Sequence, residues 1–358
     1  MNVFVSEFIC GGALAWTAFP ESLRREGAAM LWAVVDDLLR VPNCRVAITL
    51  DRRLFDAAAN ARSDTCLVEP VLNPDEERLA FDRLARNCDA TLVIAPETDG
   101  ELARRVRRVI DLGARSLNCS AEAIELCGDK LQLARFLAAR NLPTIPTEFA
   151  DLTCDEPPRH QDSPCVLKPR DGAGSWLTFL VPPGGHDAWQ RAVREFTAAG
   201  ATDRALRQPF ISGQPLSAGC LCHSDGRIEV LPIGRQNIST DRFHYQGGSI
   251  PAHLPDEVTA AAVHLIHQTC AAIPGLRGYI GFDLLLPDAA PQSPLIVEIN
   301  PRLTTSYVGY RRLCHDNLVE RWLQLTQSNA QSEQAPTRLT WQPGTIHFNS
   351  AGECHNGP

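Results

Sequence analysis

The first third of the chain alternates between short apolar runs and longer segments whose apolar residues recur with helical spacing. The short runs are typical of strands, and they lie at 3–5, 45–50, 66–71 and 90–95. The segments that follow the period of an amphipathic helix lie at 21–39, 74–87 and 100–112. Because strands and helices alternate, we predict βαβ units and an open parallel sheet.

The pattern changes after residue 120. A helix is predicted at 129–140, and from residue 165 to about residue 251 short strands are interrupted by glycine and proline. This pattern predicts an α+β unit with antiparallel strands and one helix near 188–199. A third unit begins at residue 254, and its predicted elements are a helix, strands at 279–286 and 295–299, and a helix at 317–327.

The fold class is therefore predicted to combine α/β and α+β architecture. A chain of 358 residues is too long for one simple core, so we expect two or three subdomains around a shared cleft. The predicted segments are 1–119, 120–251, 252–327 and 328–358. The last segment should hold a linker poor in hydrophobic residues at 327–336, a final strand at 345–349 and a flexible tail.

The composition is that of a globular protein, with 44% hydrophobic and 21% charged residues. A net charge of −8 and an isoelectric point near 5.7 argue against a general binder of nucleic acid or membrane surfaces. No apolar run reaches the roughly 18 to 20 residues of a membrane span. The first residues resemble a strand rather than a signal peptide, so we expect a cytoplasmic protein.

The 13 cysteines are scattered and odd in number, and no CxxC pair occurs. We interpret them as reduced thiols that pack as small hydrophobic side chains. Cys220 and Cys222 are two residues apart in a predicted strand. No second pair matches them, which argues against a zinc site.

Only two of the 34 cationic side chains are lysine, Lys130 and Lys168. A lysine kept where arginine is otherwise used indicates a place that needs a compact, flexible ammonium group. The alternative is chance survival on the surface, and composition alone leaves both interpretations open.

The residues around these lysines add a candidate phosphate site. Lys130 follows Cys127-Gly128-Asp129 at a predicted helix start, and Lys168 precedes the glycine-containing segment 171–175. Glycines let backbone N–H groups approach phosphate oxygens closely, and a lysine adds positive charge. The alternative is a plain β-turn beside one exposed lysine.

Three polar residues lie in otherwise apolar predicted strands: Asp283, Glu298 and Asn300. Buried carboxylates cost several kcal/mol unless they are paired or bind a metal. Glu298 and Asn300 are two residues apart and project from one face of their strand. Three oxygen ligands suit Mg²⁺. The alternative, in which Glu298 only pairs with Arg302, leaves Asp283 and Asn300 unexplained.

From about residue 120 to residue 325, the order of these segments resembles that of the ATP-grasp superfamily. The motif that completes the order is Arg207-Gln208-Pro209-Phe210-Ile211-Ser212-Gly213, an apolar strand that ends at a glycine. The resemblance implies an ATP-grasp fold, preceded by an N-terminal open parallel βαβ domain of the pre-ATP-grasp type.

The resemblance also implies ATP and Mg²⁺ as cofactors, with Mn²⁺ able to replace Mg²⁺. The implied contacts are Lys130 and Lys168 with the phosphates and adenine edge; Gly172, Gly174 and Ser175 over the phosphates; Gln208, Pro209, Phe210 and Ile211 with adenine; and Asp283, Glu298 and Asn300 with the metal. Arg302 would neutralise the transferring phosphoryl group.

Three positions depart from the pattern of D-alanine–D-alanine ligases. Gln208 replaces a glutamate, Pro215 stands where a ribose-binding glutamate is common, and Gly281 stands where an arginine precedes the first metal aspartate. Arg235 or Arg302 is then expected to replace that arginine, and together with Lys168 they form the predicted catalytic set.

Segments 5–12, 94–100 and 300–307 resemble the ATP-grasp group that contains tyramine–glutamate ligase of methanofuran biosynthesis. The residues that this resemblance places against the substrate are Glu7, Gly11, Gly12, Glu97, Tyr245, Gly247, Gly248, Thr304, Thr305 and Ser306. In this interpretation residues 245–248 form a covering loop. The alternatives are a simple hairpin at Gly247-Gly248 and a helix cap at 304–306.

The resemblance implies a ligase that joins a small carboxylate, glutamate-like in this group, to an amine through an acyl phosphate. ADP and phosphate are released, and the product belongs to one-carbon cofactor biosynthesis. Two alternatives remain: another ATP-grasp reaction, such as carboxylation or dipeptide ligation, and a non-catalytic ATP-binding sensor. Dimers are common in the superfamily, so a homodimer is also expected.

Overall fold

A computed structural model describes residues 1–55, 64–153, 162–172, 174–223, 225–239, 242–325 and 338–357. The predicted linker at 327–336 lies outside the described residues, as does most of the loop before residue 163. The described helices include none that is both long enough and apolar enough to cross a membrane.

The N-terminal part of the structure is the predicted open parallel sheet. Its strands are β1 (Asn2–Glu7), β2 (Arg45–Asp51), β3 (Cys66–Val71) and β4 (Ala90–Ile94), in the order β3-β2-β1-β4. All of its pairings are parallel. The helices are α1 (Glu21–Leu39), α3 (Pro74–Asn87) and α4 (Glu101–Asp111).

Both faces of this sheet are buried, which explains its continuous apolar runs. Val3 and Val5 join the core on the α1 side, whereas Phe4 packs edge-on against Phe81 of α3, with ring centroids 5.5 Å apart. Helix α3 begins as its sequence predicts, because the Asn73 side chain accepts a hydrogen bond from the Glu76 N–H.

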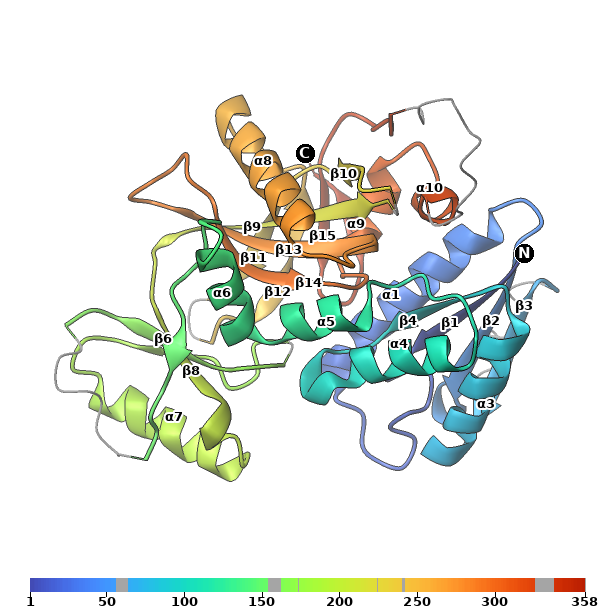
Figure 1. Ribbon diagram of the computed structural model, residues 1–358, viewed down its shortest axis with the longest axis horizontal. Coiled ribbons are helices and arrows are strands. Elements are labelled where there is room, and N and C mark those ends of the chain that lie inside the picture. Colours follow the sequence, from blue (N-terminus) through green and yellow to red (C-terminus); the bar gives the residue numbers. More distant parts are fainter. Residues whose placement is uncertain are drawn as a thin grey trace.

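A large antiparallel sheet forms the centre of the molecule (Figure 1). Its order is β14-β13-β9-β11-β12-β15-β16, and β10 pairs with β9. The strands are β9 (Gly213–Cys222), β10 (Ile228–Val230), β11 (Gly234–Ile238), β12 (Tyr245–Ile250), β13 (Gly278–Pro287), β14 (Leu295–Asn300), β15 (Ile346–Asn349) and β16 (Cys354–Asn356). The associated helices are α5 (Ala121–Gly128), α8 (Asp256–Ala272), α9 (Tyr307–Leu313) and α10 (Leu318–Leu325).

Two expectations about this region need revision. The predicted boundary at residue 251 does not separate two sheets, because β9 to β12 share one sheet with β13 and β14. The tail predicted to be flexible forms β16 after the final strand β15. A polar turn joins the two, in which the Asn349 side chain accepts hydrogen bonds from the N–H groups of Ala351 and Glu353.

A smaller antiparallel sheet forms a separate lobe, seen at the lower left of Figure 1. Its order is β5-β8-β6-β7, with β5 (Glu148–Phe149), β6 (Cys165–Pro169), β7 (Phe179–Val181) and β8 (Ala205–Pro209). Helix α7 (His186–Ala198) packs on it through Trp189 and Phe196. Helix α6 (Lys130–Ala138) follows α5, and short 3₁₀ turns lie at Arg52–Leu54, Thr98–Gly100 and Thr202–Arg204.

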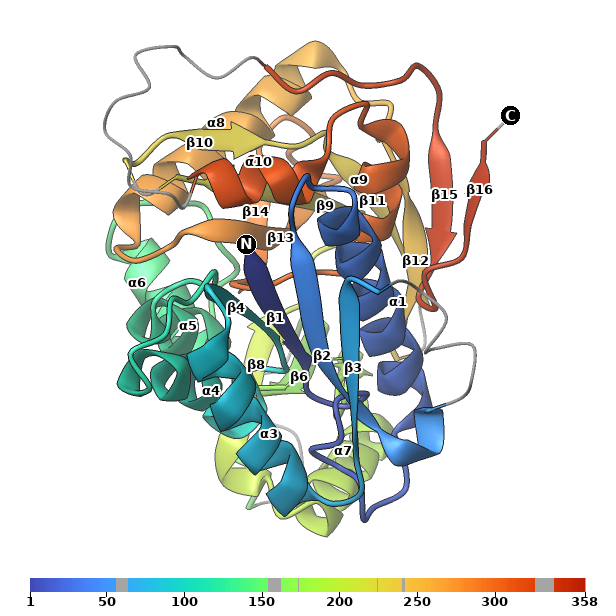
Figure 2. The same ribbon diagram turned by 90° about the vertical axis from the view of Figure 1, so that its right-hand side faces the viewer.

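Helix α1 lies between the parallel sheet and the C-terminal helices (Figure 2). Asp37 of α1 is 1% exposed, and its carboxylate accepts hydrogen bonds from Tyr307 and Arg311 of α9. The Asn317 side chain donates to the Asp37 backbone carbonyl. A buried polar network therefore joins the first and last parts of the chain.

Candidate active site

The three predicted metal ligands lie on one face of the large sheet. Strands β13 and β14 pair so that Asp283 is directly opposite Glu298 and Gly281 is opposite Asn300. The Asn300 amide donates to Asp283 Oδ2 at 3.0 Å. Gln236 of β11 donates to the other Asp283 oxygen at 2.6 Å. The structure thus brings Asp283, Glu298 and Asn300 together, as the sequence predicts.

The charges of this group fit a divalent cation. Burial and the neighbouring Glu298 carboxylate raise the pKa of Asp283 to about 6. Burial also acts against the charged form of Glu298, but the charges of Lys130 and Lys168 outweigh it and lower the pKa of Glu298. Two carboxylates and an amide oxygen held side by side are the ligand type that Mg²⁺ prefers, and a cation between them would relieve the repulsion.

Both lysines reach this group, and neither is a surface residue. Lys130 is 8% exposed, and its Nζ lies 3.1 Å from Glu298 Oε1 and 3.0 Å from the Gly172 carbonyl oxygen. Lys168 is 7% exposed and lies on the face of β6 opposite to Leu167, which packs under α7. Burial lowers the pKa of Lys168 to about 8. These positions exclude the alternatives in which the lysines are exposed.

Helix α6 begins where Lys130 enters the cleft. Asp129 accepts a hydrogen bond from the Gln132 N–H and so caps the first turn. The same carboxylate also accepts a hydrogen bond of 2.8 Å from Nε of Arg170, which follows β6. This ion pair ties the start of α6 to the residue that follows β6, and so links the segments that carry the two lysines.

The glycine-containing loop contacts Lys130, helix α1 and the segment before β12. The α-carbon of Gly174 faces Leu23 of α1, and an added Cβ would lie 3.3 Å from Leu23 Cδ2. The Ser175 hydroxyl donates to the Phe243 carbonyl at 2.5 Å. Lys130 holds the loop at Gly172. Ala173, within the predicted loop, lies outside the described residues.

The predicted adenine hinge connects the two antiparallel sheets. Gln208 and Pro209 end β8, and Phe210 and Ile211 lead to β9. The Gln208 amide is buried and donates to the Thr147 hydroxyl at 2.7 Å. Phe210 is 36% exposed and lies 6.3 Å from Phe243, measured between ring centroids. The hinge and residue 243 therefore present an apolar wall beside the phosphate loop.

The two predicted catalytic arginines are in different places. Arg302 follows β14, and its Nε donates to Glu97 of the N-terminal part at 2.9 Å. Arg235 is exposed, and it lies opposite Leu216 of β9 in the strand register. The Leu216 side chain belongs to the apolar core on the face of the sheet that Asp283 does not occupy. The Arg235 side chain therefore points to that face as well. The structure does not bring Arg235 to the site. The neighbouring Gln236 faces it instead, because successive strand residues point to opposite faces.

The predicted turn at Thr304, Thr305 and Ser306 follows Arg302 in the chain. Tyr279 OH is 2.9 Å from the Thr304 hydroxyl and 3.4 Å from that of Ser306. Ser306 precedes α9 but makes no capping hydrogen bond with its side chain. The alternative of a simple side-chain cap is therefore not supported, and these hydroxyls form a network with Tyr279.

Tyr245, Gly247 and Gly248 lie in strand β12 rather than in a covering loop or a hairpin turn. β12 is paired on both sides, with β11 and with β15. Gly247 has φ +121°, and an added Cβ would lie 2.0 Å from the Phe348 carbonyl oxygen. The two glycines are thus required by close strand packing, and Tyr245 is half-buried at the strand end.

Glu7, Gly11 and Gly12 form a tight turn after β1. The Glu7 carboxylate is 3% exposed and accepts a hydrogen bond from the Cys10 N–H at 2.5 Å. Burial raises the pKa of Glu7 to about 7. Gly11 donates its N–H to the Glu7 carbonyl at 2.8 Å. Glu97 is farther along the same edge of the parallel sheet, where it meets Arg302.

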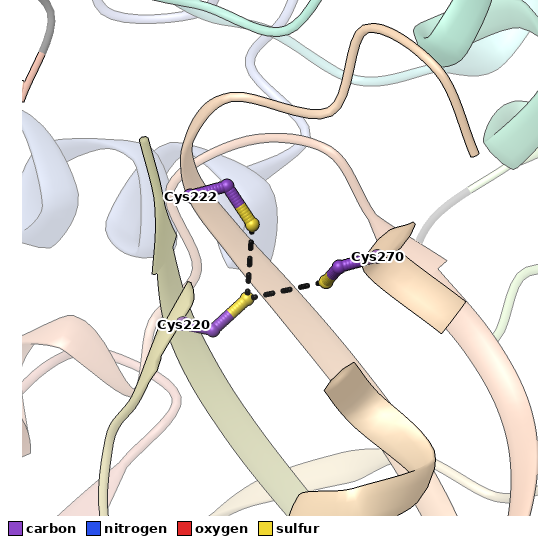
Figure 3. Close-up of side chains that lie close together, drawn as sticks. All are labelled: Cys220, Cys222 and Cys270. Carbon is purple, nitrogen blue, oxygen red and sulfur yellow. Dashed lines mark hydrogen bonds between the residues drawn. The ribbon is translucent and has the colours of Figure 1, made fainter. Parts of the chain in front are cut away.

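A separate group of thiols lies on the opposite face of the large sheet (Figure 3). Cys220 Sγ is 3.8 Å from Cys222 Sγ and 3.9 Å from Cys270 Sγ of α8. All three are buried, and the described histidines and carboxylates do not extend the group. Burial in the apolar core raises the pKa of the Cys220 thiol, which favours the neutral form of this side chain.

The arrangement of these parts, with buried lysines and carboxylates between two antiparallel sheets, is typical of nucleotide-binding enzymes. The ATP-grasp domain matches residues 127–306, and the pre ATP-grasp 3 domain matches residues 44–124. The chain belongs to the ATP-grasp family.

Relatives and solved structures agree with this assignment. Tyramine–L-glutamate ligase of Methanocaldococcus jannaschii is 26% identical over 276 residues, covering 76% of this chain and 73% of that protein. The enzyme of the same name from Methanocaldococcus fervens is 25% identical over 330 residues, covering 91% and 94%. With its ATP-grasp domain, the chain is an ATP-dependent ligase.

Two solved structures show the same fold. An ATP-grasp superfamily protein from Archaeoglobus fulgidus has a TM-score of 0.67 and 21% identity, covering 96% of this chain and 98% of that one. The biotin carboxylase domain of 2-oxoglutarate carboxylase from Hydrogenobacter thermophilus, in complex with MgADP and bicarbonate, has a TM-score of 0.68 and 14% identity, covering 97% and 73%.

Proposed function

We propose that this protein joins a small carboxylic acid to an amine, using ATP and forming an acyl phosphate as the intermediate. The observation that carries the proposal is the convergence of Lys130, Lys168, Asp283, Glu298 and Asn300 in one buried cleft, with Arg302 at its inner end. Phosphoryl transfer depends mainly on positioned charges, and this cleft supplies charges of both signs.

Each wall of the cleft has one task in the proposal. Lys130 and Lys168 contact the phosphates and the adenine edge, and the loop with Gly172, Gly174 and Ser175 covers the phosphates. Gln208, Pro209, Phe210 and Ile211 hold the adenine. Asp283, Glu298 and Asn300 hold Mg²⁺, which when bound neutralises charge on the β- and γ-phosphates.

Arg302 is oriented to receive the acid. Its Nε is bound to Glu97 and its Nη1 donates to the Leu303 carbonyl at 3.2 Å. Its Nη2 has no hydrogen-bond partner among the described residues, so it can donate to the substrate carboxylate. The charges of Glu97 and Glu298 also raise the pKa of Arg302 against the effect of its burial, so this side chain stays cationic.

The chemistry proceeds in two steps. A carboxylate oxygen bonds to the γ-phosphorus of ATP, the bond from that phosphorus to the β–γ bridging oxygen breaks, and ADP leaves. The nitrogen of the neutral amine then bonds to the acyl carbon, the bond from that carbon to the phosphorylated oxygen breaks, and phosphate leaves. The proton released from nitrogen passes to the phosphate or to water.

The names of the two curated relatives support a glutamate-like acid and an aromatic amine as the substrates. A role in one-carbon cofactor biosynthesis is proposed from the resemblance of segments 5–12, 94–100 and 300–307 alone. The reduced state of the described cysteines supports a cytoplasmic location, and the protein is proposed to act on small molecules either alone or as a homodimer.

An ADP-release screen tests the proposal. Purified protein, ATP and Mg²⁺ are combined with L-glutamate and a panel of amines that includes tyramine, and separately with bicarbonate or D-alanine. We expect ADP release that requires both the acid and the amine, and an amide product by mass spectrometry. Release with bicarbonate alone would instead indicate carboxylation, and release with no substrate pair would contradict the ligase assignment.

A further inference from the structure

Glu26 of α1 lies at the junction of the phosphate loop, Arg302 and Tyr245. Residues 23, 26 and 27 share one face of α1, because positions three and four apart are neighbours on a helix. On that face, Leu23 meets Gly174 of the phosphate loop, and Gly27 packs so closely on Glu7 that an added Cβ would lie 2.4 Å from Glu7 Oε1. Glu26 is between these two contacts.

The Glu26 carboxylate is close enough to two residues of the site to act on them electrostatically. Its charge acts on Arg302 and on Tyr245, two residues that come from β14 and β12 on the other side of the cleft. Arg302 itself is hydrogen-bonded to Glu97, which leaves Glu26 outside that ion pair.

The two arginines next to Glu26 in α1 pair with Glu21 rather than with Glu26. Arg24 and Arg25 flank it in the helix, but Arg24 donates to Glu21 through its Nε at 2.9 Å, and Arg25 lies 3.7 Å from Glu21. Among the described residues no hydrogen bond or ion pair engages the Glu26 carboxylate. Burial raises the pKa of this group, and the charge of Arg302 offsets this effect only in part.

We propose that Glu26 binds the ammonium group of the acceptor amine, and that the half-buried ring of Tyr245 contacts its apolar part. Before the nitrogen attacks the acyl phosphate, this ammonium group passes one proton to the Glu26 carboxylate or to water. This inference rests on the proposed ligase function. An exposed surface carboxylate would be solvated, whereas a half-buried one beside the acyl-phosphate site provides a specific place for a cationic amine. The acid would lie on the Arg302 side of the same pocket, so the two substrates are separated by charge.

Glu26→Gln tests this assignment, because it removes the charge and keeps the shape. Glu21→Gln is the matched control, since Glu21 lies on the same helix and is exposed. With L-glutamate and ATP held constant, we expect Glu26→Gln to raise the KM for tyramine at least ~10-fold, the effect of losing one hydrogen bond to a charged group. The KM for ATP should change much less, and Glu21→Gln should retain the wild-type KM values.

Hydroxylamine provides a readout that separates amine binding from acid activation. It is uncharged at neutral pH and traps acyl phosphates as hydroxamates without an ammonium-binding group. We expect the ratio of hydroxamate to amide product to rise at least ~10-fold in Glu26→Gln relative to wild type and to Glu21→Gln. If tyramine is not a substrate, the most active amine of the ADP-release screen replaces it.

The outcomes are distinct. An unchanged KM for the amine, or an equal loss of hydroxamate and amide, would overturn the assignment of Glu26 while leaving the ligase function intact. If wild-type protein forms neither ADP nor hydroxamate with any acid, the ligase function itself fails, and this inference fails with it.

Discussion

At the scale of single residues, the site depends on charges that are buried close to one another. Lys168 is 7% exposed, and the carboxylates of Glu298 and Asp283 partly offset the burial that lowers its pKa to about 8. Asp283 and Glu298 are opposed across two strands, and each affects the ionisation of the other. Small changes of shape or pH at these positions should therefore have large effects on nucleotide binding.

Lys168→Arg should lower kcat/KM for ATP by about 100-fold although it preserves the charge. The planar guanidinium is larger than an ammonium group, and the buried position next to Lys130 and Glu298 leaves little space for it. Steady-state kinetics check this, with Arg78→Lys on the exposed side of α3 as the control. If Lys168→Arg keeps the wild-type kcat/KM for ATP, a positive charge at this position is sufficient for ATP use and the shape of the lysine side chain is not required.

The same lysine predicts a pH dependence. In the free enzyme Lys168 loses its proton as pH rises through about 8, and the neutral amine no longer attracts phosphate. We expect kcat/KM for ATP to fall above about pH 8, whereas kcat falls only at higher pH, because bound phosphate favours the charged form. The fall in kcat/KM should disappear in Lys168→Arg, whose guanidinium stays charged over this range.

Glu298→Ala should reduce turnover by about 100- to 1000-fold and weaken the dependence on Mg²⁺ concentration. The substitution removes one carboxylate of the proposed metal group and leaves Lys130 without its ion-pair partner. A Mg²⁺ titration of activity measures both effects. Glu257→Ala, an exposed position on α8, is the control, and unchanged turnover in Glu298→Ala would refute the metal assignment.

At the scale of elements, helix α1 packs against the parallel sheet and also against residues of the proposed active site, and its amphipathic pattern alone does not show the second contact. Its apolar side supplies the core of the parallel sheet, and the face with Leu23 and Gly27 packs against Gly174 and Glu7. The close approach at Gly27 is what allows the helix to lie against Glu7. Glu7 cannot move away easily, since its other carboxylate oxygen accepts the Cys10 N–H.

Gly27→Ala should therefore destabilise the protein by about 1–3 kcal/mol, the usual cost of overpacking. Helix propensity alone predicts the opposite sign, because alanine favours a helix interior by about 1 kcal/mol over glycine. Chemical denaturation distinguishes the two, with Ser22→Ala on the exposed side of α1 for comparison. A more stable Gly27→Ala variant would mean that α1 can shift away from Glu7.

At the scale of the whole molecule, the N-terminal part and the C-terminal helices are held together by buried polar contacts rather than by a flexible linker. Asp37 receives hydrogen bonds from Tyr307 and Arg311, which are about 270 residues away in the sequence. Arg302 and Glu97 form a second such connection at the active site. We expect both parts to unfold together, because breaking either connection exposes or leaves unpaired a buried charge.

Asp37→Ala should lower the free energy of unfolding by about 3–5 kcal/mol, since it leaves the Arg311 guanidinium without its buried partner. Denaturation followed by both far-UV circular dichroism and tryptophan fluorescence should give coincident transitions in the wild type. Asp75→Ala, at an exposed ion pair of α3, should change stability by less than about 1 kcal/mol. Equal effects of the two substitutions would mean that the Asp37 network adds little.

Local patterns predicted most elements because each depends on near neighbours. The βαβ series, the strands around Asp283 and Glu298, and the start of α6 all have apolar periods or caps that can be identified in the sequence. Strand partners are different, because pairing joins residues far apart. For this reason the predicted boundary at residue 251 divides a single sheet, and Tyr245 to Gly248 is a paired strand rather than a loop.

The sequence by itself determined the residue types of the proposed nucleotide site: two lysines retained among arginines, a glycine-containing loop, and three oxygen-bearing side chains in apolar strands. Only the tertiary structure decided which other side chains join them. It turned Gln236 rather than Arg235 toward Asp283, and it brought Glu26 of α1 close enough to Arg302 for their charges to interact. Neither could be recognised from its neighbours in the chain, because their surroundings depend on strand register and on helix packing between distant segments.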